Sequence, residues 1–409
     1  MSIIQPNEPR EPHAIERGAT MYRIATLNNI AEKGLNKLDP ASYEISEDAT
    51  SADAILVRSH AMHDMELPSS LKAIARAGAG VNNIPIDRCT DRGIVVFNTP
   101  GANANSVKEL VIAGMLLASR DIYHAVEWAQ SQAGAEDVAK RVEKNKKRFA
   151  GPEILGKRLG VVGLGAVGVN VANAAVGLGM DVVGFDPFIS VESAWGLSRA
   201  VGRASGLDEL FSTSDYITLH VPLNDNTRHM VSETQLRSMK QGVRLLNFAR
   251  GGLVDDSALI AAIKADRVAA YVTDFPEAPL LGVDGVIPIP HLGASTPEAE
   301  ENCAVMAATQ VSDFLETGNI RNSVNFPECR LQPSGNPRLL ITNRNIPNMV
   351  GQITTVLAGE NINILDLLNR HRDQIAYNII DMDKLPREEV LAAVQQIDGV
   401  ICHRVVTFD

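Results

Sequence analysis

Two successive series of short apolar runs, each alternating with helical patterns, constrain the fold of this chain more than any other feature. The first series begins near residue 21 and contains "YRIATL", "AILVRS" and "GIVVFN". The second begins at 159 and extends from "LGVVGLG" to "GVIPIP". Continuous apolar runs that alternate with helices are typical of parallel strands buried on both faces. The sequence therefore predicts an α/β fold with two Rossmann-like, doubly wound parallel-sheet domains.

The last part of the chain has a different pattern. Residues 338–409 give the order strand, helix, strand, strand, helix, strand, after a Pro/Gly/Ser/Asn-rich linker at 325–337. This βαββαβ order predicts a ferredoxin-like unit of the size of a small regulatory domain.

Helical patterns connect the predicted sheets. A long helical stretch is expected over 106–130. One helix is expected after 297, with threonine or serine at its N-cap and glycine beyond its end. The basic piece "KRVEKNKKRFAG" (140–151) is either a solvated helix face or a contact with substrate.

Composition excludes several classes of protein. The 409 residues carry a formal net charge of −11, which disfavours binding to nucleic acid or anionic membranes. The longest apolar stretch (110–118) is far shorter than a membrane span, and the polar segment before residue 20 has no signal-peptide core. The four scattered cysteines lack metal-ligand spacing, so we expect reduced thiols in a cytoplasmic protein and no metal site.

The segment "VVGLGAVG" has the spacing of a dinucleotide-binding turn. Gly163, Gly165 and Gly168 follow an apolar strand and open an alanine-rich helix, so backbone amides can approach a pyrophosphate. The next strand ends at Asp186, where a carboxylate would accept from ribose hydroxyls and repel a 2′-phosphate. The pattern predicts NAD as cofactor; the alternative is a structural glycine turn and a loop aspartate.

Two further residues are candidates for chemistry. Arg250 directly follows the apolar strand in "LLNFARGG", at the end of a strand where open α/β sheets bind ligands. Its planar guanidinium suits a carboxylate, although an arginine in this place can also form a surface ion pair. His291 lies in the stiff turn "IPHLGAST", and by itself such a residue is more often a half-buried loop histidine.

Taken together and in this order, four segments resemble the D-2-hydroxyacid dehydrogenases: "VVGLGAVG", "HVPLNDNTRHMV", "NFARGGLVDD" and "PHLGAST". The segments "VRSH", "RAGAGVNNI" and "NTPGANANSVKEL", with the C-terminal βαββαβ unit, narrow the resemblance to members that oxidise 3-phospho-D-glycerate and carry an ACT domain. The resemblance covers about residues 22–409.

The resemblance implies three domains. They are a discontinuous substrate-binding domain (21–105 and 298–326), an NAD-binding domain (106–297) and an ACT regulatory domain (338–409). It also implies an active site in the cleft and an Asn-Ser cap on the helix that follows "NTPGANANS".

The resemblance also assigns catalytic roles. Arg250 matches the arginine that holds the substrate carboxylate and carbonyl, and His291 matches the histidine that transfers the proton. The glutamate that usually pairs with this histidine is replaced by Pro279 here. Either the loop shifts to bring Glu277 to His291, or another acid serves, or the pairing is absent.

The remaining expected sites follow from the same resemblance. The expected cofactor contacts are Gly163, Gly165, Ala166, Val167, Gly168, Asp186, Pro222, Thr227, Ala249, Asp274 and Gly293. The expected contacts with the substrate and its phosphate are Arg58, Ser59, Arg76, Gly80, Val81 and Asn82. The expected effector site for L-serine consists of Asn343, Asn345 and Asn363, where Asn343 replaces the histidine usual in this loop.

The function that we expect is NAD-dependent oxidation of 3-phosphoglycerate to 3-phosphooxypyruvate, the first step of L-serine biosynthesis, in a homo-oligomer inhibited by serine. A structural dimerisation module is the alternative for the ACT domain. For the whole chain, the alternatives are another D-2-hydroxyacid dehydrogenase and a non-catalytic NAD-sensing protein.

Overall fold

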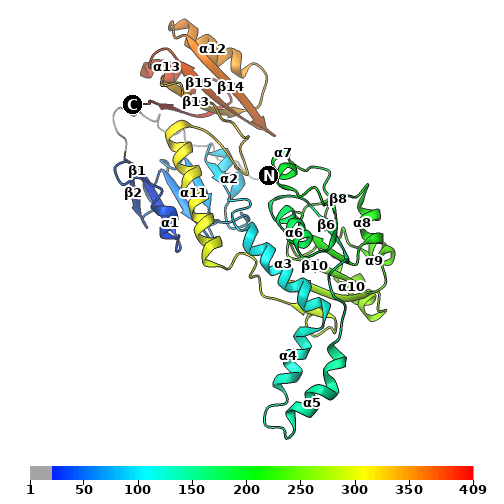
Figure 1. Ribbon diagram of the computed structural model, residues 1–409. Coiled ribbons are helices and arrows are strands. Elements are labelled where there is room, and N and C mark those ends of the chain that lie inside the picture. The colour runs from blue at the N-terminus through cyan, green and yellow to red at the C-terminus, as the bar shows by residue number, and fades with distance from the viewer. Residues whose placement is uncertain (1–20, 409) are drawn as a thin grey trace, which may run out of the picture. The chain divides into compact units, whose positions relative to one another are not determined.

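The computed structural model describes residues 21–408 and divides into two compact units (Figure 1). The first unit joins the described residues up to Ala102 with those from Glu300 onward, and the second comprises Asn103–Ala299. The N-terminal segment that we expected to be a loose leader lies outside the described residues. The predicted ACT region forms a sheet of its own but shares the first unit with the predicted substrate-binding region.

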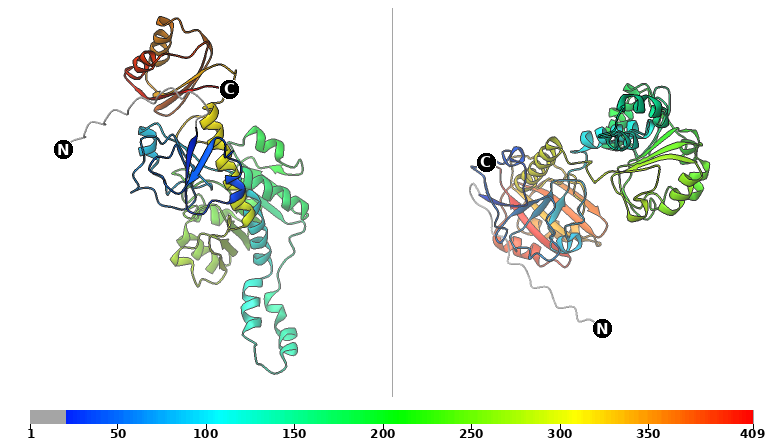
Figure 2. Two further views of the ribbon diagram at one scale, coloured as in Figure 1. Left: turned by 90° about the vertical axis from the view of Figure 1, so that its left-hand side faces the viewer. Right: turned by 90° about the horizontal axis from the view of Figure 1, so that it is seen from below.

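The first unit contains a five-stranded parallel sheet in the order β2-β1-β3-β4-β5. The strands are β1 (Tyr22–Leu27), β2 (Tyr43–Ser46), β3 (Ala54–Val57), β4 (Ala73–Arg76) and β5 (Val95–Phe97). The helices are α1 (Glu32–Leu35), α2 (Ile86–Asp91) and the long α11 (Pro297–Thr317). Helix α11 lies beside this sheet (Figure 2). Its apolar side chains share one core with the strands, so a helix from late in the chain completes the core of the first strands.

The second unit contains a seven-stranded parallel sheet in the order β12-β11-β10-β9-β6-β7-β8. Its strands are β6 (Arg158–Val162), β7 (Asp181–Phe185), β8 (Gly202–Arg203), β9 (Tyr216–Leu219), β10 (Val243–Asn247), β11 (Val268–Thr273) and β12 (Val286–Pro288). The strand order reverses between β6 and β9, and ligands of open α/β sheets bind at such a reversal. The predicted α/β class with two doubly wound parallel sheets is confirmed.

Helices complete the second unit. They are α3 (Ala104–Ser119), α4 (Ile122–Gln130), α5 (Val138–Asn145), α6 (Ala166–Gly177), α7 (Val191–Gly196), α8 (Leu207–Thr213), α9 (Glu233–Ser238) and α10 (Asp256–Lys264). The stretch predicted to be helical over 106–130 forms two helices, because Asp121 takes a left-handed conformation (φ 41°) and separates α3 from α4. The predicted Asn-Ser cap is wrong, since α3 begins at Ala104 and no side chain caps its first turn.

The C-terminal sheet is antiparallel, in the order β14-β15-β13-β16. Its strands are β13 (Arg338–Arg344), β14 (Ile364–Arg372), β15 (Ile375–Met382) and β16 (Val400–Val406), and its helices are α12 (Met349–Gly359) and α13 (Glu388–Gln395). The predicted βαββαβ order is confirmed. One face packs on α12 and α13, and the other joins the core of the first sheet.

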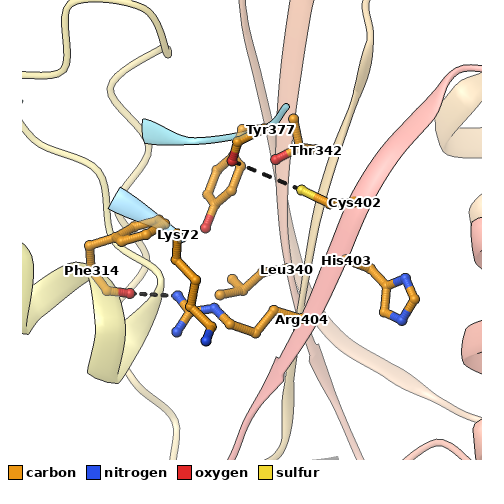
Figure 3. Close-up of a pocket in the computed structure, with 9 residues that line it drawn as sticks. Lys72, Phe314, Leu340, Thr342, Tyr377, Cys402, His403 and Arg404 are labelled. Carbon is orange, nitrogen blue, oxygen red and sulfur yellow. Dashed lines mark hydrogen bonds between the residues drawn. The ribbon is translucent and has the colours of Figure 1, made fainter. Parts of the chain in front are cut away.

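Side chains of the C-terminal sheet cap the last turn of α11. Arg404 donates to the carbonyls of Phe314 and Leu315 at 2.7 and 2.5 Å, and Arg338 donates to Thr317 O at 2.9 Å. Figure 3 shows Arg404 directed toward Phe314, beside a cavity of about 40 Å³ that is also lined by Lys72 and Tyr377. These cations add hydrogen bonds to carbonyls of the last helical turn and complement the helix dipole.

The buried Arg338 also forms an ion pair with Asp381 at 2.6 Å, with side chains 0% and 1% exposed. The segment 325–337, which we predicted as a linker, is irregular but packed, because Phe326 and Cys329 are each only 1% exposed. No helix among the described residues is long and apolar enough to cross a membrane.

Candidate active site

The predicted glycine turn lies between β6 and α6 and is sterically required. Gly163 has φ +89°, and a Cβ there would lie 2.5 Å from His220 O. A Cβ on Gly168 would lie 1.9 Å from Gly163 O, so only glycine permits this close approach. Gly165 has open space around it, which leaves the N-terminus of α6 accessible to an anionic group.

Asp186 follows β7 and is held by the same turn. Its carboxylate accepts from the backbone amides of Leu164 and Phe188, each at 2.8 Å. The carboxylate is therefore fixed beside the glycine turn, at the carboxyl end of the strands, and half-buried. These residues fit the pyrophosphate and ribose of a dinucleotide.

The other expected cofactor contacts lie in loops of the second unit and in the first turn of α6. Thr227 closes a turn by donating to Pro222 O at 2.6 Å, and Ala249 follows β10 directly. Ala166 and Val167 form the first turn of α6. Gly293 donates its backbone N–H to Asp274 Oδ2 at 3.3 Å.

Asn247, the last residue of β10, holds the loop that carries Arg250. Its Nδ2 donates to Arg250 O at 2.8 Å, and its Oδ1 accepts from the backbone of Ala249 at 3.2 Å. Asn247 is 1% exposed, whereas the Arg250 side chain is exposed and its guanidinium lies 6.0 Å from the Phe275 ring. Sequence reasoning missed Asn247, although a polar residue ending the apolar run "LLN" was the available signal.

His291 lies beside the same aromatic ring, that of Phe275. Its ring is 4.4 Å from that of Phe275, centroid to centroid, and the ring is exposed. Asp274 is buried, which raises the pKa of its carboxyl, while the positive charges of His291 and Arg250 oppose that rise. The second unit thus brings together Arg250, Asp274 and His291, which lie far apart in sequence.

Asp274 has one unused acceptor. Its Oδ2 accepts from Gly293, but Oδ1 is buried without a hydrogen-bond partner among the described residues. A buried acceptor of this kind requires a donor. A carboxamide N–H of a nicotinamide would supply one, so this residue fits the expected cofactor.

Glu277 lies beside Gly251 and near Asp256. Its Oε1 is 3.4 Å from the Cβ position of Gly251, and its negative charge contributes to a raised pKa of Asp256, for which burial is the main cause. Within residues 21–408, His291 forms no ion pair or hydrogen bond with Glu277. The catalytic role of Glu277 stays a prediction.

The expected phosphate contacts lie at the carboxyl ends of β3 and β4 in the first unit. Arg76 Nε donates to Arg58 O at 3.0 Å, and the Arg76 guanidinium covers Gly78, where a Cβ would lie 1.9 Å from Nη1. Arg58 Nη2 donates to Glu300 Oε1 at 2.7 Å, a partner that sequence reasoning missed.

The other expected substrate contacts lie in the adjoining loops. Ser59 N donates to Asn28 Oδ1 at 3.1 Å, and Asn82 is exposed in the turn after Gly80 and Val81. The described residues contain no group of three or more His, Cys, Asp or Glu that could hold a metal ion.

The expected effector residues differ in accessibility. Asn345 and Asn363 are exposed. Asn343 is 1% exposed, and its Oδ1 accepts from Asn378 Nδ2 at 2.7 Å. Asn369 donates in turn to Asn378 at 2.6 Å, so an asparagine chain crosses β14, β15 and β13. No local sequence pattern indicated this row of asparagines.

Residues 112–293 match the family described as D-isomer specific 2-hydroxyacid dehydrogenase, NAD binding domain. A D-3-phosphoglycerate dehydrogenase of Escherichia coli is 31% identical over 94% of this chain and 97% of its own length. The chain belongs to the D-2-hydroxyacid dehydrogenases. Its second unit accordingly contains the NAD-binding domain of this family.

Other relatives of this dehydrogenase are longer. A D-3-phosphoglycerate dehydrogenase of Methanocaldococcus jannaschii is 38% identical over 80% of this chain, and the match covers 61% of that protein. One from Archaeoglobus fulgidus is 38% identical over 77% of this chain and 59% of its own length. The chain thus spans about three fifths of these relatives.

Solved structures agree with this family. The NAD⁺-bound 3-phosphoglycerate dehydrogenase of Entamoeba histolytica matches with a TM-score of 0.58 and 26% identity, over 75% of this chain and 99% of that one. A D-lactate dehydrogenase of Aquifex aeolicus with NAD and lactic acid matches with a TM-score of 0.57 and 25% identity, over 75% and 100%. Both matches support NAD as the cofactor of this dehydrogenase.

Proposed function

We propose that this dehydrogenase oxidises 3-phospho-D-glycerate to 3-phosphooxypyruvate with NAD, the first step of L-serine biosynthesis. The observation that carries the proposal is the convergence of Arg250, Asp274 and His291 at the end of the NAD-binding sheet. The identities of 31–38% to D-3-phosphoglycerate dehydrogenases support the choice of substrate.

The proposed reaction removes a hydride from C2 of the substrate and a proton from its hydroxyl. NAD, when bound, supplies the hydride acceptor. His291 takes the hydroxyl proton as general base and returns it in the reverse direction. Arg250 holds the substrate carboxylate in two parallel hydrogen bonds and polarises the developing carbonyl.

Residues of this chain would also hold the cofactor. The amides of the glycine turn and the N-terminus of α6 would bind the pyrophosphate, and the Asp186 carboxylate would accept hydrogen bonds from the ribose hydroxyls. Asp274 would accept a hydrogen bond from the carboxamide through its buried Oδ1. We assign Glu277 as the acid that pairs with His291, which requires a shift of its loop; its carboxylate would then stabilise the imidazolium formed during the reaction.

The substrate phosphate is assigned to Arg58 and Arg76, whose guanidinium groups lie on neighbouring strand ends. Ser59 and the turn of Gly80, Val81 and Asn82 add hydroxyl and amide donors. Two arginines give a phosphate more hydrogen bonds than a single surface cation would.

Feedback inhibition by L-serine in a homo-oligomer is part of the proposal. The exposed Asn345 and Asn363 support an effector site in the C-terminal domain, whereas Asn343 is buried and would act by positioning the loop. Calorimetric titration with L-serine tests this, and substitution of Asn345 and Asn363 by alanine should abolish any heat of binding.

The main test compares NADH oxidation with 3-phosphooxypyruvate, 2-oxoglutarate and glyoxylate in parallel. We expect turnover with the phosphorylated acid and little with the other two. Turnover of unphosphorylated acids only would favour another D-2-hydroxyacid dehydrogenase. Binding of NADH without turnover of any acid would favour a sensor.

A further inference from the structure

Glu300 forms an ion pair with Arg58, whose guanidinium the proposed function assigns to the substrate phosphate. Arg58 Nη2 and Glu300 Oε1 are 2.7 Å apart, the distance of a charge-assisted hydrogen bond. The two side chains are 36% and 41% exposed, so solvent and small anions can reach the pair.

The chain places Glu300 there for local reasons. Glu300 lies in the first turn of α11, after Thr296, whose Oγ1 accepts from Ala299 N at 3.1 Å and caps the helix. A helix N-terminus stabilises a carboxylate, because its unpaired N–H groups carry partial positive charge. The Glu300 carboxylate is thus stabilised from the helix side and from Arg58 at once.

The cluster also contains Arg76 and the Cys303 thiol, one turn further along α11. Burial raises the pKa of Cys303, while Arg76 and Arg58 lower it and Glu300 raises it, so all three charges lie around one thiol. Glu300 thus places a negative charge beside Arg58, where a phosphate dianion is expected. The carboxylate therefore opposes binding of that phosphate.

We propose that Glu300 is a specificity-determining residue that competes with the substrate phosphate for Arg58. Binding of a phosphorylated 2-hydroxy acid exchanges the Arg58–Glu300 ion pair for an Arg58–phosphate pair, and no covalent bond changes. The pair thus weakens binding of phosphorylated acids, while unphosphorylated acids, which do not use Arg58, are unaffected. The inference depends on the proposed function for its substrate class.

The alternative is that Glu300 holds Arg58 in place for the phosphate and so favours substrate binding. Two substitutions of Glu300 distinguish this positioning role from competition. Glu300→Gln keeps an oxygen that accepts from Arg58 but removes the charge, and Glu300→Ala removes both. Competition predicts that both variants bind phosphorylated substrate more tightly. Positioning predicts that Gln behaves like the parent protein and that Ala binds more weakly.

Glu301 provides a matched control on the next residue of the same helix turn. It pairs with Lys33 at 2.8 Å, and their side chains are 40% and 60% exposed, so its charge and exposure resemble those of Glu300. Glu301→Gln removes the same charge from the helix without touching Arg58. It should leave the KM for the phosphorylated acid unchanged.

The experiment measures steady-state kinetics of the full chain with 3-phosphooxypyruvate and with glyoxylate. For Glu300→Gln we expect the KM for the phosphorylated acid to fall about two- to five-fold, the size typical of a solvent-exposed ion pair. The kcat and the KM for NADH should not change, and added salt should reduce the difference. An unchanged or higher KM, or an equal effect of Glu301→Gln, would overturn the proposal.

Binding measured without turnover separates this inference from the proposed function. Calorimetric titration of inorganic phosphate and of 3-phosphoglycerate into the parent protein and Glu300→Gln reports on Arg58 directly. If the parent protein turns over no phosphorylated acid, the proposed function fails, and tighter phosphate binding by Glu300→Gln would still support the competition. Equal phosphate affinity of the two proteins would contradict the competition, whatever the activity.

Discussion

At the scale of single residues, the proposed catalytic rate depends on the planar guanidinium of Arg250. Arg250→Lys should retain NAD binding, because no cofactor contact is assigned to this side chain. It should lower kcat/KM by about 10²-fold, since an ammonium cannot reproduce the paired hydrogen bonds. Steady-state kinetics and NADH fluorescence titration measure the two effects. Arg237→Lys, on the exposed Arg237–Glu233 pair of α9, is the control.

His291→Asn should lower kcat by about 10²- to 10⁴-fold, the usual contribution of a general acid–base residue. The asparagine fits the exposed turn, so thermal unfolding of the variant should resemble that of the parent protein. A variant with the parent rate would remove the proton-transfer assignment.

His220 should make the second unit sensitive to acid. Burial lowers the pKa of His220 from 6.5 to about 3, and its Nε2 lies 2.9 Å from Thr218 Oγ1. The unfolded chain therefore binds a proton at a higher pH than the folded chain does. The stabilisation is complete above pH about 6.5 and declines by about 1.4 kcal/mol per pH unit as the pH falls toward the folded pKa. Urea unfolding between pH 7 and 5 should show a smaller loss for His220→Gln.

At the scale of elements, two glycines of α6 should respond differently to substitution by alanine, because only one of them packs against the turn between β6 and α6. Gly168→Ala would place a Cβ 1.9 Å from Gly163 O, so it should abolish NAD binding and destabilise the second unit by several kcal/mol. Gly177→Ala meets nothing within 4 Å and should be neutral or stabilise by about 0.5–1 kcal/mol. Urea unfolding and calorimetric titration with NAD measure both variants.

The sequence was sufficient for the elements whose patterns are local. Apolar runs predicted the parallel strands, the glycine spacing predicted the dinucleotide turn, and Thr296 and Gly318 correctly bounded α11. The break at Asp121 was missed because a left-handed aspartate leaves no mark on hydrophobic periodicity.

The missed contacts of the candidate site are those that join distant segments. Arg58 and Glu300 are 242 positions apart, and Asn343 meets Asn378 across a sheet whose register no local pattern specifies. Only the packing of α11 on the first sheet makes Glu300 a neighbour of Arg58. Residue types could therefore be predicted at the site, but their partners could not.

At the scale of the whole molecule, the buried Arg338–Asp381 pair should contribute more to stability than any exposed pair of the same unit. Asp381→Asn leaves a buried guanidinium without its counter-charge and should cost about 3–5 kcal/mol. The control is Asp91→Asn, which breaks the exposed Arg344–Asp91 pair and should cost less than about 1 kcal/mol. Urea unfolding of the full chain measures both, and equal losses would contradict the difference.

The carbonyls at the end of α11 accept hydrogen bonds from Arg338, Arg404 and Tyr377 of the C-terminal sheet. These hydrogen bonds have a consequence for protein engineering. A chimaera that inherits the C-terminal sheet from one parent and this helix from another would bring together donors and acceptors that did not evolve as a set. A workable crossover point must therefore lie before Pro297, so that the helix and the sheet are transplanted as one piece.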